Sequence, residues 1–253
     1  MFGSLVRNLR HRLPQTRTCY VSMMAKKNDT EIKVLDALQE QALKEQCILV
    51  NENDDAVGFA SKASCHRVRN DTKEVKLHRA FSVFLFNSAG DMLMQRRSEQ
   101  KITFPDMYTN ACCSHPLYDI EAERVATSAL GIRKAAQRRL NYELGIPMEQ
   151  IRPEYFHYLT RIHYKHTGDG VWGEHEIDYI LFLQQDVDLN PNLNEVSEIR
   201  YIKRNNIDEE IRKLQAPLTP WFELILKERL KIWWDNLKNL NKFEEHHVIQ
   251  RFL

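Results

Sequence analysis

Two glutamates separated by one residue are the first feature that could do chemistry: Glu174 and Glu176, in the segment Trp172-Gly173-Glu174-His175-Glu176. The apolar stretch 177–183 that follows them indicates a β-strand, in which side chains alternate between the two faces. We therefore expect both carboxylates to point the same way. Such a pair can hold a cation or move a proton.

A thiol and an imidazole have the same spacing in Cys113-Ser114-His115. Cysteine can serve as a nucleophile or a proton donor, and histidine is a common metal ligand. An isolated cysteine is more often a buried structural thiol, so Cys113 taken alone does not establish a reactive group.

The composition excludes several classes of protein. A net charge of +1 over 253 residues gives no reason to invoke nucleic acid, and no apolar run approaches the length that spans a bilayer, so we expect no membrane insertion. The 5 cysteines lack the paired spacing of a zinc ribbon or a disulfide scaffold. We interpret them as free thiols in a reducing compartment.

The first 30 residues differ from the rest of the chain, because six basic residues precede the first acidic one, Asp29. Arginine-rich, acid-poor and amphipathic composition is typical of a mitochondrial presequence, and a disordered basic leader is the alternative. Translation from Met23 or Met24 would give a cytosolic or peroxisomal form, although residues 251–253 are a poor likeness of a peroxisomal signal.

The elements that must position these side chains begin with a helix over 31–45, after the possible cap Thr30. Short strands are expected at 47–50 and 57–60, joined by the acidic turn 51–55. The apolar run 80–86 reads as a strand buried on both faces, and residues 87–91 turn it into a hairpin with 92–95.

The second half predicts a helix over 130–144 that stops at Gly145, followed by further strands at 155–164, 176–183 and 198–202. Two more helices follow at 207–214 and 221–240, the latter with Thr219 as cap and Pro220 at its first position. This order predicts an α+β fold, a layered sandwich around a mixed sheet, as a single domain over 31–253.

The helix 130–144 ends in Arg138-Arg139-Leu140-Asn141-Tyr142-Glu143-Leu144-Gly145-Ile146, which resembles the end of the Nudix box. Arg139 and Tyr142 stand where that pattern has glutamates, and only Glu143 remains. The resemblance implies a site that binds a magnesium diphosphate and is poorly equipped to hydrolyse it. An ordinary amphipathic helix that buries Ala135, Leu140 and Leu144 is the alternative.

Five segments, 77–82, 84–87, 101–105, 109–116 and 172–179, together resemble the metal-dependent type I family of isopentenyl-diphosphate isomerases, and most of all its animal members. The likeness runs from about Glu31 to near the C-terminus; Asp106 departs from it, because many relatives have glycine there. It implies a Nudix-like α/β/α sandwich with added N- and C-terminal helices. It also implies an isomerase that interconverts isopentenyl and dimethylallyl diphosphate by moving protons, for isoprenoid and sterol synthesis.

The resemblance assigns roles to matching residues. Proton handling is implied for Cys113 and Glu176, in an undetermined order, and Tyr164, Trp172 and Trp221 match aromatic positions near the pocket, with core packing as the alternative. Catalytic roles are thus implied for Cys113, Glu176 and Tyr164; substrate binding for Lys62, Arg97, Lys101, Ser114 and Trp221; and metal binding for His66, His78, His115, Glu174 and Glu176, with Glu143 at a second Mg²⁺ carried by the substrate. Nitrogen and oxygen ligands leave Mg²⁺, Mn²⁺ and Zn²⁺ open at the His/Glu site.

Two rival functions remain at this point: a Nudix pyrophosphohydrolase, opposed by Arg139 and Tyr142, and a non-catalytic module in which metal only stabilises the fold. We expect a small prenyl diphosphate as the partner and a monomer as the oligomeric state.

Overall fold

The computed structural model describes residues 36–253. The expected leader 1–30, the alternative starts Met23 and Met24, and the first part of the helix expected at 31–45, including its cap Thr30, lie outside the described residues. In the part that is described, no helix combines the length and the apolar character needed to cross a bilayer.

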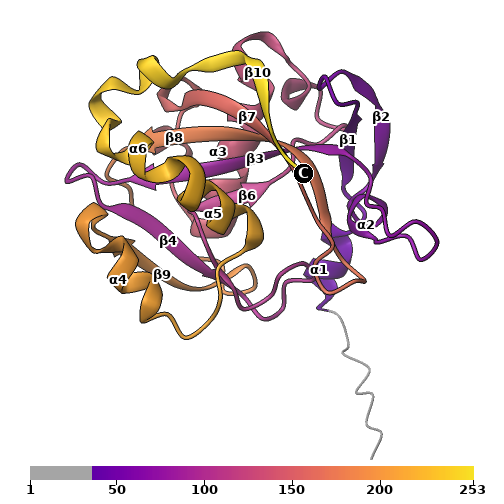
Figure 1. Ribbon diagram of the computed structural model, residues 1–253, viewed down its shortest axis with the longest axis horizontal. Helices are drawn as coiled ribbons and strands as arrows, with labels where there is room; N and C mark the ends of the chain where they lie inside the picture. Colours follow the sequence, from indigo (N-terminus) through magenta and orange to yellow (C-terminus); the bar gives the residue numbers. More distant parts are fainter. Residues whose placement is uncertain (1–35) are drawn as a thin grey trace, which may run out of the picture. The chain divides into compact units, whose positions relative to one another are not determined.

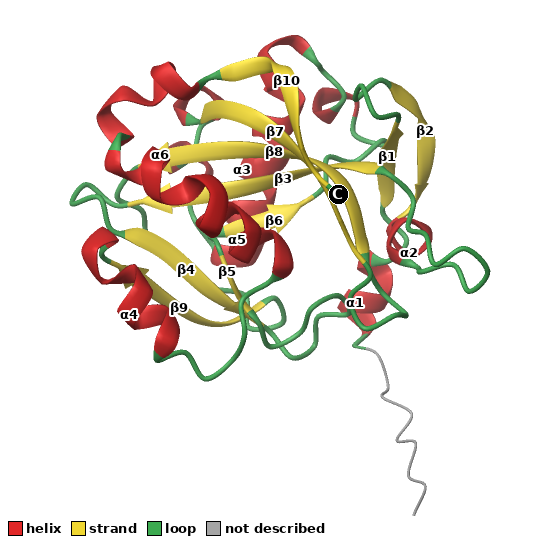
Figure 2. Cartoon of the chain, in the orientation of Figure 1, coloured by secondary structure: helices red, strands yellow, loops and turns green. Residues whose placement is uncertain are grey.

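The elements follow one another along the chain as shown in Figures 1 and 2. The strands are β1 (Gln46–Val50), β2 (Ala56–Ser61), β3 (His78–Phe86), β4 (Met92–Arg97), β5 (Tyr108–Thr109), β6 (Cys112–Ser114), β7 (His157–His166), β8 (Glu174–Gln184), β9 (Val196–Ile202) and β10 (Glu245–Phe252). The α-helices are α1 (Ala37–Ala42), α2 (Lys62–His66), α3 (Leu130–Leu144), α4 (Ile207–Arg212), α5 (Pro220–Ile225) and α6 (Lys231–Asp235).

The strands form one mixed sheet with the order β10-β7-β8-β3-β1-β2. Outside this order, β4 pairs with β3, β5 and β9, and β6 pairs with β3. Strand β3 is parallel to β8, and β7 is antiparallel to β8. Alternation along β3 sends Phe84 and Phe86 to a core under the C-terminal helices, and Phe81, Val83 and Leu85 to a core under α3. Helices therefore cover both faces of the sheet, and the predicted α/β/α sandwich is confirmed (Figure 2).

Helix α3 spans the predicted residues. It ends at Gly145, whose φ of 64° suits the left-handed conformation that glycine adopts without strain. Its predicted core residues Ala135, Leu140 and Leu144 are fully buried. The strands expected from apolar runs are also present, with bounds that differ by a few residues.

Three details differ from the prediction. The hairpin of β3 and β4 is limited to the pair Phe86 and Met92, because β6 occupies the edge of β3 further along and β4 pairs with β9 instead. The helix expected over 221–240 is interrupted by a π-helical turn at Leu226–Leu230 and ends in 3₁₀ turns. Thr219 stands at the cap position of α5, but its hydroxyl donates to Thr109 and not to the helix.

A buried ion-pair network fastens the turn between β1 and β2 to the sheet. The carboxylate of Asp54 accepts hydrogen bonds from Arg79 of β3 at 2.7 Å, from Arg161 of β7 at 3.0 Å, and from the Tyr179 hydroxyl of β8. Removing one partner of a buried pair leaves the remaining charges uncompensated. We expect Asp54→Asn to lower the free energy of unfolding by about 3 kcal/mol in urea titrations.

The exposed neighbour Asp55 supplies the matched control, since Asp55→Asn removes the same charge from the same turn. That variant is expected to change the free energy of unfolding by less than about 0.5 kcal/mol. Equal effects of the two substitutions would show that the network does not stabilise the fold.

Candidate active site

Side chains from separate elements meet where β3 and β8 begin. The register pairs His78 with Glu176 across these parallel strands and Tyr164 with Glu176 across β7 and β8. Strand β6 pairs with β3 and carries Cys113 opposite Ser82. The sheet register therefore brings the Glu-x-Glu motif and the Cys-x-His motif together, although about 60 residues separate them in the sequence.

Five residues form a buried cluster whose ligand atoms all lie within 4.8 Å of one another: His66, His78, His115, Glu174 and Glu176. Glu176 Oε1 lies 2.9 Å from His115 Nε2 and 3.3 Å from His78 Nε2. Glu174 Oε2 lies 2.8 Å from His66 Nδ1. All five predicted ligands of the His/Glu site are thus in one place.

The cluster has unused bonding capacity. His66 Nε2 is buried and has no hydrogen-bond partner within the described chain, and the buried Glu174 Oε2 has only its 2.8 Å ion-pair contact with His66 Nδ1. Burial and the neighbouring Glu176 raise the pKa of Glu174 well above its usual range, while burial and His78 lower that of His66. A cation would satisfy both atoms, and a set of three imidazoles and two carboxylates suits a divalent metal.

One carboxylate oxygen of Glu176 faces the histidines of the cluster, and the other faces the hydroxyl of Tyr164. Its Oε2 accepts a hydrogen bond from the Tyr164 hydroxyl at 2.5 Å. Burial opposes ionisation of Glu176, but hydrogen bonds from His115 and His78 outweigh it and hold its pKa well below the usual range. Glu176 is therefore an ionised carboxylate, able to accept a proton or share one with Tyr164.

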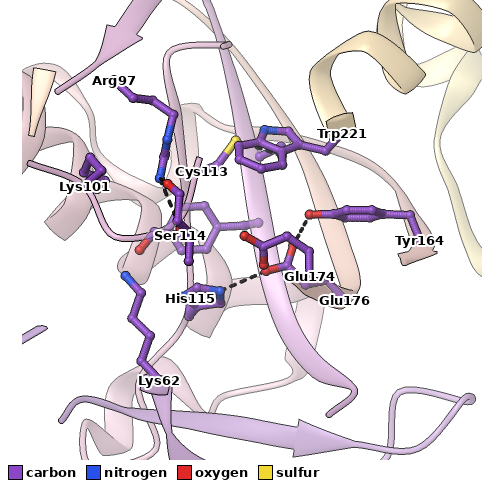
Figure 3. A pocket seen from close by; sticks show the side chains of 13 residues that line it. Lys62, Arg97, Lys101, Cys113, Ser114, His115, Tyr164, Glu174, Glu176 and Trp221 are labelled. Atoms are coloured by element: carbon purple, nitrogen blue, oxygen red, sulfur yellow. Dashed lines mark hydrogen bonds and ion pairs between the residues drawn. The ribbon is translucent and has the colours of Figure 1, made fainter. Parts of the chain in front are cut away.

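Cys113 and Glu176 line the same cavity (Figure 3). Burial and the nearby Asp178 raise the pKa of the Cys113 thiol well above its usual range, so the thiol is protonated near neutral pH. Trp221 and Tyr164 add aromatic surface to the lining of this cavity. The complete lining comprises Lys62, Phe81, Ser82, Arg97, Lys101, Thr103, Cys113, Ser114, His115, Tyr164, Glu174, Glu176 and Trp221.

The predicted diphosphate contacts Lys62, Arg97, Lys101 and Ser114 also line this cavity. Arg97 is held by the carbonyls of Phe104 at 2.9 Å and Thr103 at 2.7 Å, and its guanidinium lies 5.6 Å from the Trp221 ring centre. Lys101 is buried and paired with Glu195, and burial lowers its pKa. Contacts within the protein therefore hold the side chains of Arg97 and Lys101 in place at the cavity.

Glu143 and Trp172, two residues to which the sequence assigned roles near the site, are not part of the cavity lining. Glu143 of α3 is not part of the five-residue cluster; it is buried, and it accepts from Arg139 at 2.6 Å and from Gln95 at 3.3 Å. Arg139, which stands where the Nudix box has a glutamate, is buried between Glu143 and Glu195. Trp172 lines a separate groove of about 480 Å³ beside Phe104.

Residues that sequence reasoning missed surround the thiol. Ser82 donates to Asp178 at 2.8 Å and lies 3.2 Å from Cys113 Sγ, and Asn110 accepts from Cys113 Sγ at 3.0 Å. Asp178 follows Glu176 by two residues, so the alternation that places Glu174 and Glu176 on one face also includes it. Ser82 lies within an apolar run and gave no such signal.

The chain is similar to several known proteins. A family model described as NUDIX domain matches residues 76–222. Isopentenyl-diphosphate Delta-isomerase 1 of Mesocricetus auratus is 50% identical over 220 residues, covering 86% of this chain and 96% of the relative. The isopentenyl-diphosphate delta-isomerase of Gibberella zeae is 48% identical over 220 residues, covering 85% and 86%. Among solved structures, DR0079 of Deinococcus radiodurans has a TM-score of 0.49 at 19% identity, covering 72% of this chain and 98% of that one.

The Nudix domain and the buried His/Glu cluster together indicate divalent metal binding.

Proposed function

Since this chain belongs to the isopentenyl-diphosphate Delta-isomerase family of Nudix-domain proteins, we propose that Cys113 and Glu176 are the two groups that move protons in its reaction. The chain is an isomerase that interconverts isopentenyl diphosphate and dimethylallyl diphosphate for isoprenoid synthesis. The observation that carries the residue assignment is the single cavity lined by both the thiol and the carboxylate.

The isomerisation adds a proton at one end of an allylic system and removes another from the far side. A protonated thiol and an ionised carboxylate on one cavity form a complementary acid and base for these two steps. The Tyr164 hydroxyl donates a hydrogen bond to Glu176 and can share a proton with it, so we propose Tyr164 as the third catalytic residue. In one direction of the reaction each group gives or takes one proton, and in the reverse direction the roles exchange.

Positive charge develops on the hydrocarbon during proton transfer, and water would destroy such an intermediate. The indole of Trp221, 3% exposed, offers a ring face that stabilises a cation by about 0.5 to 2 kcal/mol.

The diphosphate is proposed to bind Lys62, Arg97, Lys101 and Ser114. Arginine can form two hydrogen bonds to phosphate oxygens, whereas lysine supplies a point charge.

We propose Mg²⁺ for the substrate diphosphate, held with the help of Glu143, and Mg²⁺, Zn²⁺ or Mn²⁺ for the His/Glu site. Two observations support these assignments: Arg139 and Lys101 keep the pKa of Glu143 low despite its burial, and His66 Nε2 at the His/Glu site is buried without a hydrogen-bond partner in the described chain. A bound divalent ion would supply positive charge that neutralises the carboxylates and the phosphate oxygens.

Metal binding at the His/Glu site gives a direct prediction. Replacing His66 by alanine removes a buried imidazole with a free Nε2, and we expect the affinity for the divalent ion to fall at least about 10-fold. Isothermal titration of metal-stripped protein with Mg²⁺, Mn²⁺ and Zn²⁺ measures this affinity. His157→Ala, an exposed histidine outside the cluster, is the control and is expected to bind as wild type does; equal binding by all three proteins would remove His66 from the site.

The proposed reaction is tested by proton NMR of isopentenyl diphosphate in D₂O with the protein and Mg²⁺. The expected result is growth of the dimethylallyl signals together with solvent deuterium in the product. Phosphate release without isomerisation would support the rival pyrophosphohydrolase, and the absence of both isomer and exchange would overturn the proposal.

For the whole chain we infer a mitochondrial leader at 1–30 and a single isomerase domain at 31–253. We further propose that the protein is a monomer and that its product is also used in sterol synthesis. The basic, acid-poor composition before Asp29 supports the leader. A fluorescent fusion of the full chain is expected to enter mitochondria, and one that begins at Met24 is expected to stay in the cytosol or reach peroxisomes. Light scattering of the purified chain tests the oligomeric state.

A further inference from the structure

Asn110 is a fully buried amide in the turn between β5 and β6, and its orientation is fixed. Its Nδ2 donates to the carbonyl of Val83 at 2.9 Å and to the carbonyl of Cys112 at 3.0 Å. Exchanging the amide oxygen and nitrogen would set an oxygen against these two carbonyls. The Oδ1 atom therefore points in one direction only.

That oxygen is an acceptor shared by three donors. It accepts from Cys113 Sγ at 3.0 Å, from Thr109 Oγ1 at 2.9 Å and from Trp221 Nε1 at 3.3 Å. The hydroxyl of Thr219, which precedes the helix carrying Trp221, donates to Thr109 at 2.9 Å and ties the same corner together. One atom thus links the proton-handling thiol to the aromatic ring.

The other two polar neighbours of the sulfur have no free proton to offer: Thr109 Oγ1, 3.9 Å away, already donates to Asn110. Ser82 donates its hydroxyl hydrogen to Asp178 at 2.8 Å, so toward Cys113 Sγ at 3.2 Å it can only accept. Only Asn110 has its acceptor direction set by two main-chain carbonyls. Asn110 itself is not among the residues that line the cavity, so it acts through Cys113 and Trp221.

We propose that Asn110 is a positioning residue for the isomerisation, whose single fixed oxygen sets the place of the Cys113 thiol relative to the Trp221 ring. This inference rests on the proposed roles of those two residues. Misplacing a reacting group by about 1 Å can slow a reaction about 100-fold while substrate binding is unchanged. The effect of Asn110 should therefore fall on kcat and not on KM.

Asn110→Ala tests this proposal with two readouts. We expect kcat to fall about 10- to 100-fold and KM to change less than about 3-fold. In ¹H–¹⁵N spectra, the indole signal of Trp221, assigned from Trp221→Phe, should move because its acceptor is gone. The indole of Trp234 donates to the carbonyl of Gly90 at 2.7 Å outside the cavity, so an unchanged Trp234 signal shows that the fold is intact.

Asn141→Ala is the control, because Asn141 also donates to a main-chain carbonyl, that of Ile146 at 2.8 Å, but makes no hydrogen bond to Cys113 or Trp221. It should lower thermal stability and leave kcat and the Trp221 signal as in wild type. Should Asn110→Ala not fold, Asn110→Ser leaves a hydroxyl that can donate to one of the two main-chain carbonyls, but its shorter side chain cannot place an acceptor where Oδ1 stands. We expect its kcat to fall about 10-fold or more as well.

The positioning role would be overturned if folded Asn110→Ala or Asn110→Ser turned over within about 3-fold of wild type, or if the Trp221 signal did not move. Absence of isomerisation in the wild-type protein would instead overturn the proposed function. The indole signals do not depend on turnover, so the two failures are distinguishable.

Discussion

Replacing Cys113 by alanine is expected to lower kcat for isomerisation about 1,000-fold or more, the size of effect seen when a proton-transfer group is removed. The thiol is the only side chain with an ionisable S–H on the described cavity lining, and its raised pKa keeps its proton available. Alanine fits the space without strain, so the fold should persist. Initial rates followed by proton NMR, with thermal unfolding in parallel, measure the loss.

The neighbouring thiol provides the control. Cys112 is buried in the core under α3, because successive side chains of β6 face opposite ways. Cys112→Ala should retain turnover within about 3-fold of wild type and lose some stability from the small cavity it leaves. If Cys113→Ala turned over as fast as Cys112→Ala, the thiol would have no part in the chemistry.

Some parts of this site were predictable from local sequence patterns. The alternation of a β-strand put Glu174 and Glu176 on one face, and the stop at Gly145 placed the end of α3 correctly. These features depend on a few adjacent residues. Local sequence was therefore sufficient to predict them.

Other parts depend on pairing between distant segments. No local pattern shows that β3 runs parallel to β8, although this pairing brings His78 to Glu176. The strand β10 was missed for the same reason, since Glu245–Phe252 carries mixed polar residues and becomes a strand by pairing with β7. The family resemblance, and not the periodicity, supplied the grouping of the three histidines.

Buried polar networks were the least predictable feature. The sequence showed only that Arg139 replaces a glutamate of the Nudix box, and not that it pairs with Glu143 and Glu195 in the core. Thr219 looked like a helix cap, but its hydroxyl joins the chain that leads to Asn110. Side chains of this kind have several available partners, and the folded structure determines which one they meet.

The second large effect is expected for Glu176→Gln, which keeps the shape of the side chain and removes its charge. Glutamine cannot accept a proton, so kcat should fall about 1,000-fold or more, and isopentenyl diphosphate recovered from D₂O should carry no deuterium. In the wild-type protein, His115 and His78 stabilise the carboxylate of Glu176, and a neutral amide at this position would weaken both contacts. NMR of both substrate and product measures the two outcomes together.

The test must separate proton transfer from metal binding, because Glu176 lies in the His/Glu cluster. If Glu176 only held a metal, excess Mg²⁺, Mn²⁺ or Zn²⁺ would restore turnover to Glu176→Gln; we expect no restoration, because the lost group is the base itself. Glu123→Gln is the matched control, since Glu123 is a buried carboxylate paired with Arg138 outside the cavity. It should lose stability and keep its turnover, so that only the carboxylate facing Tyr164 is required for proton transfer.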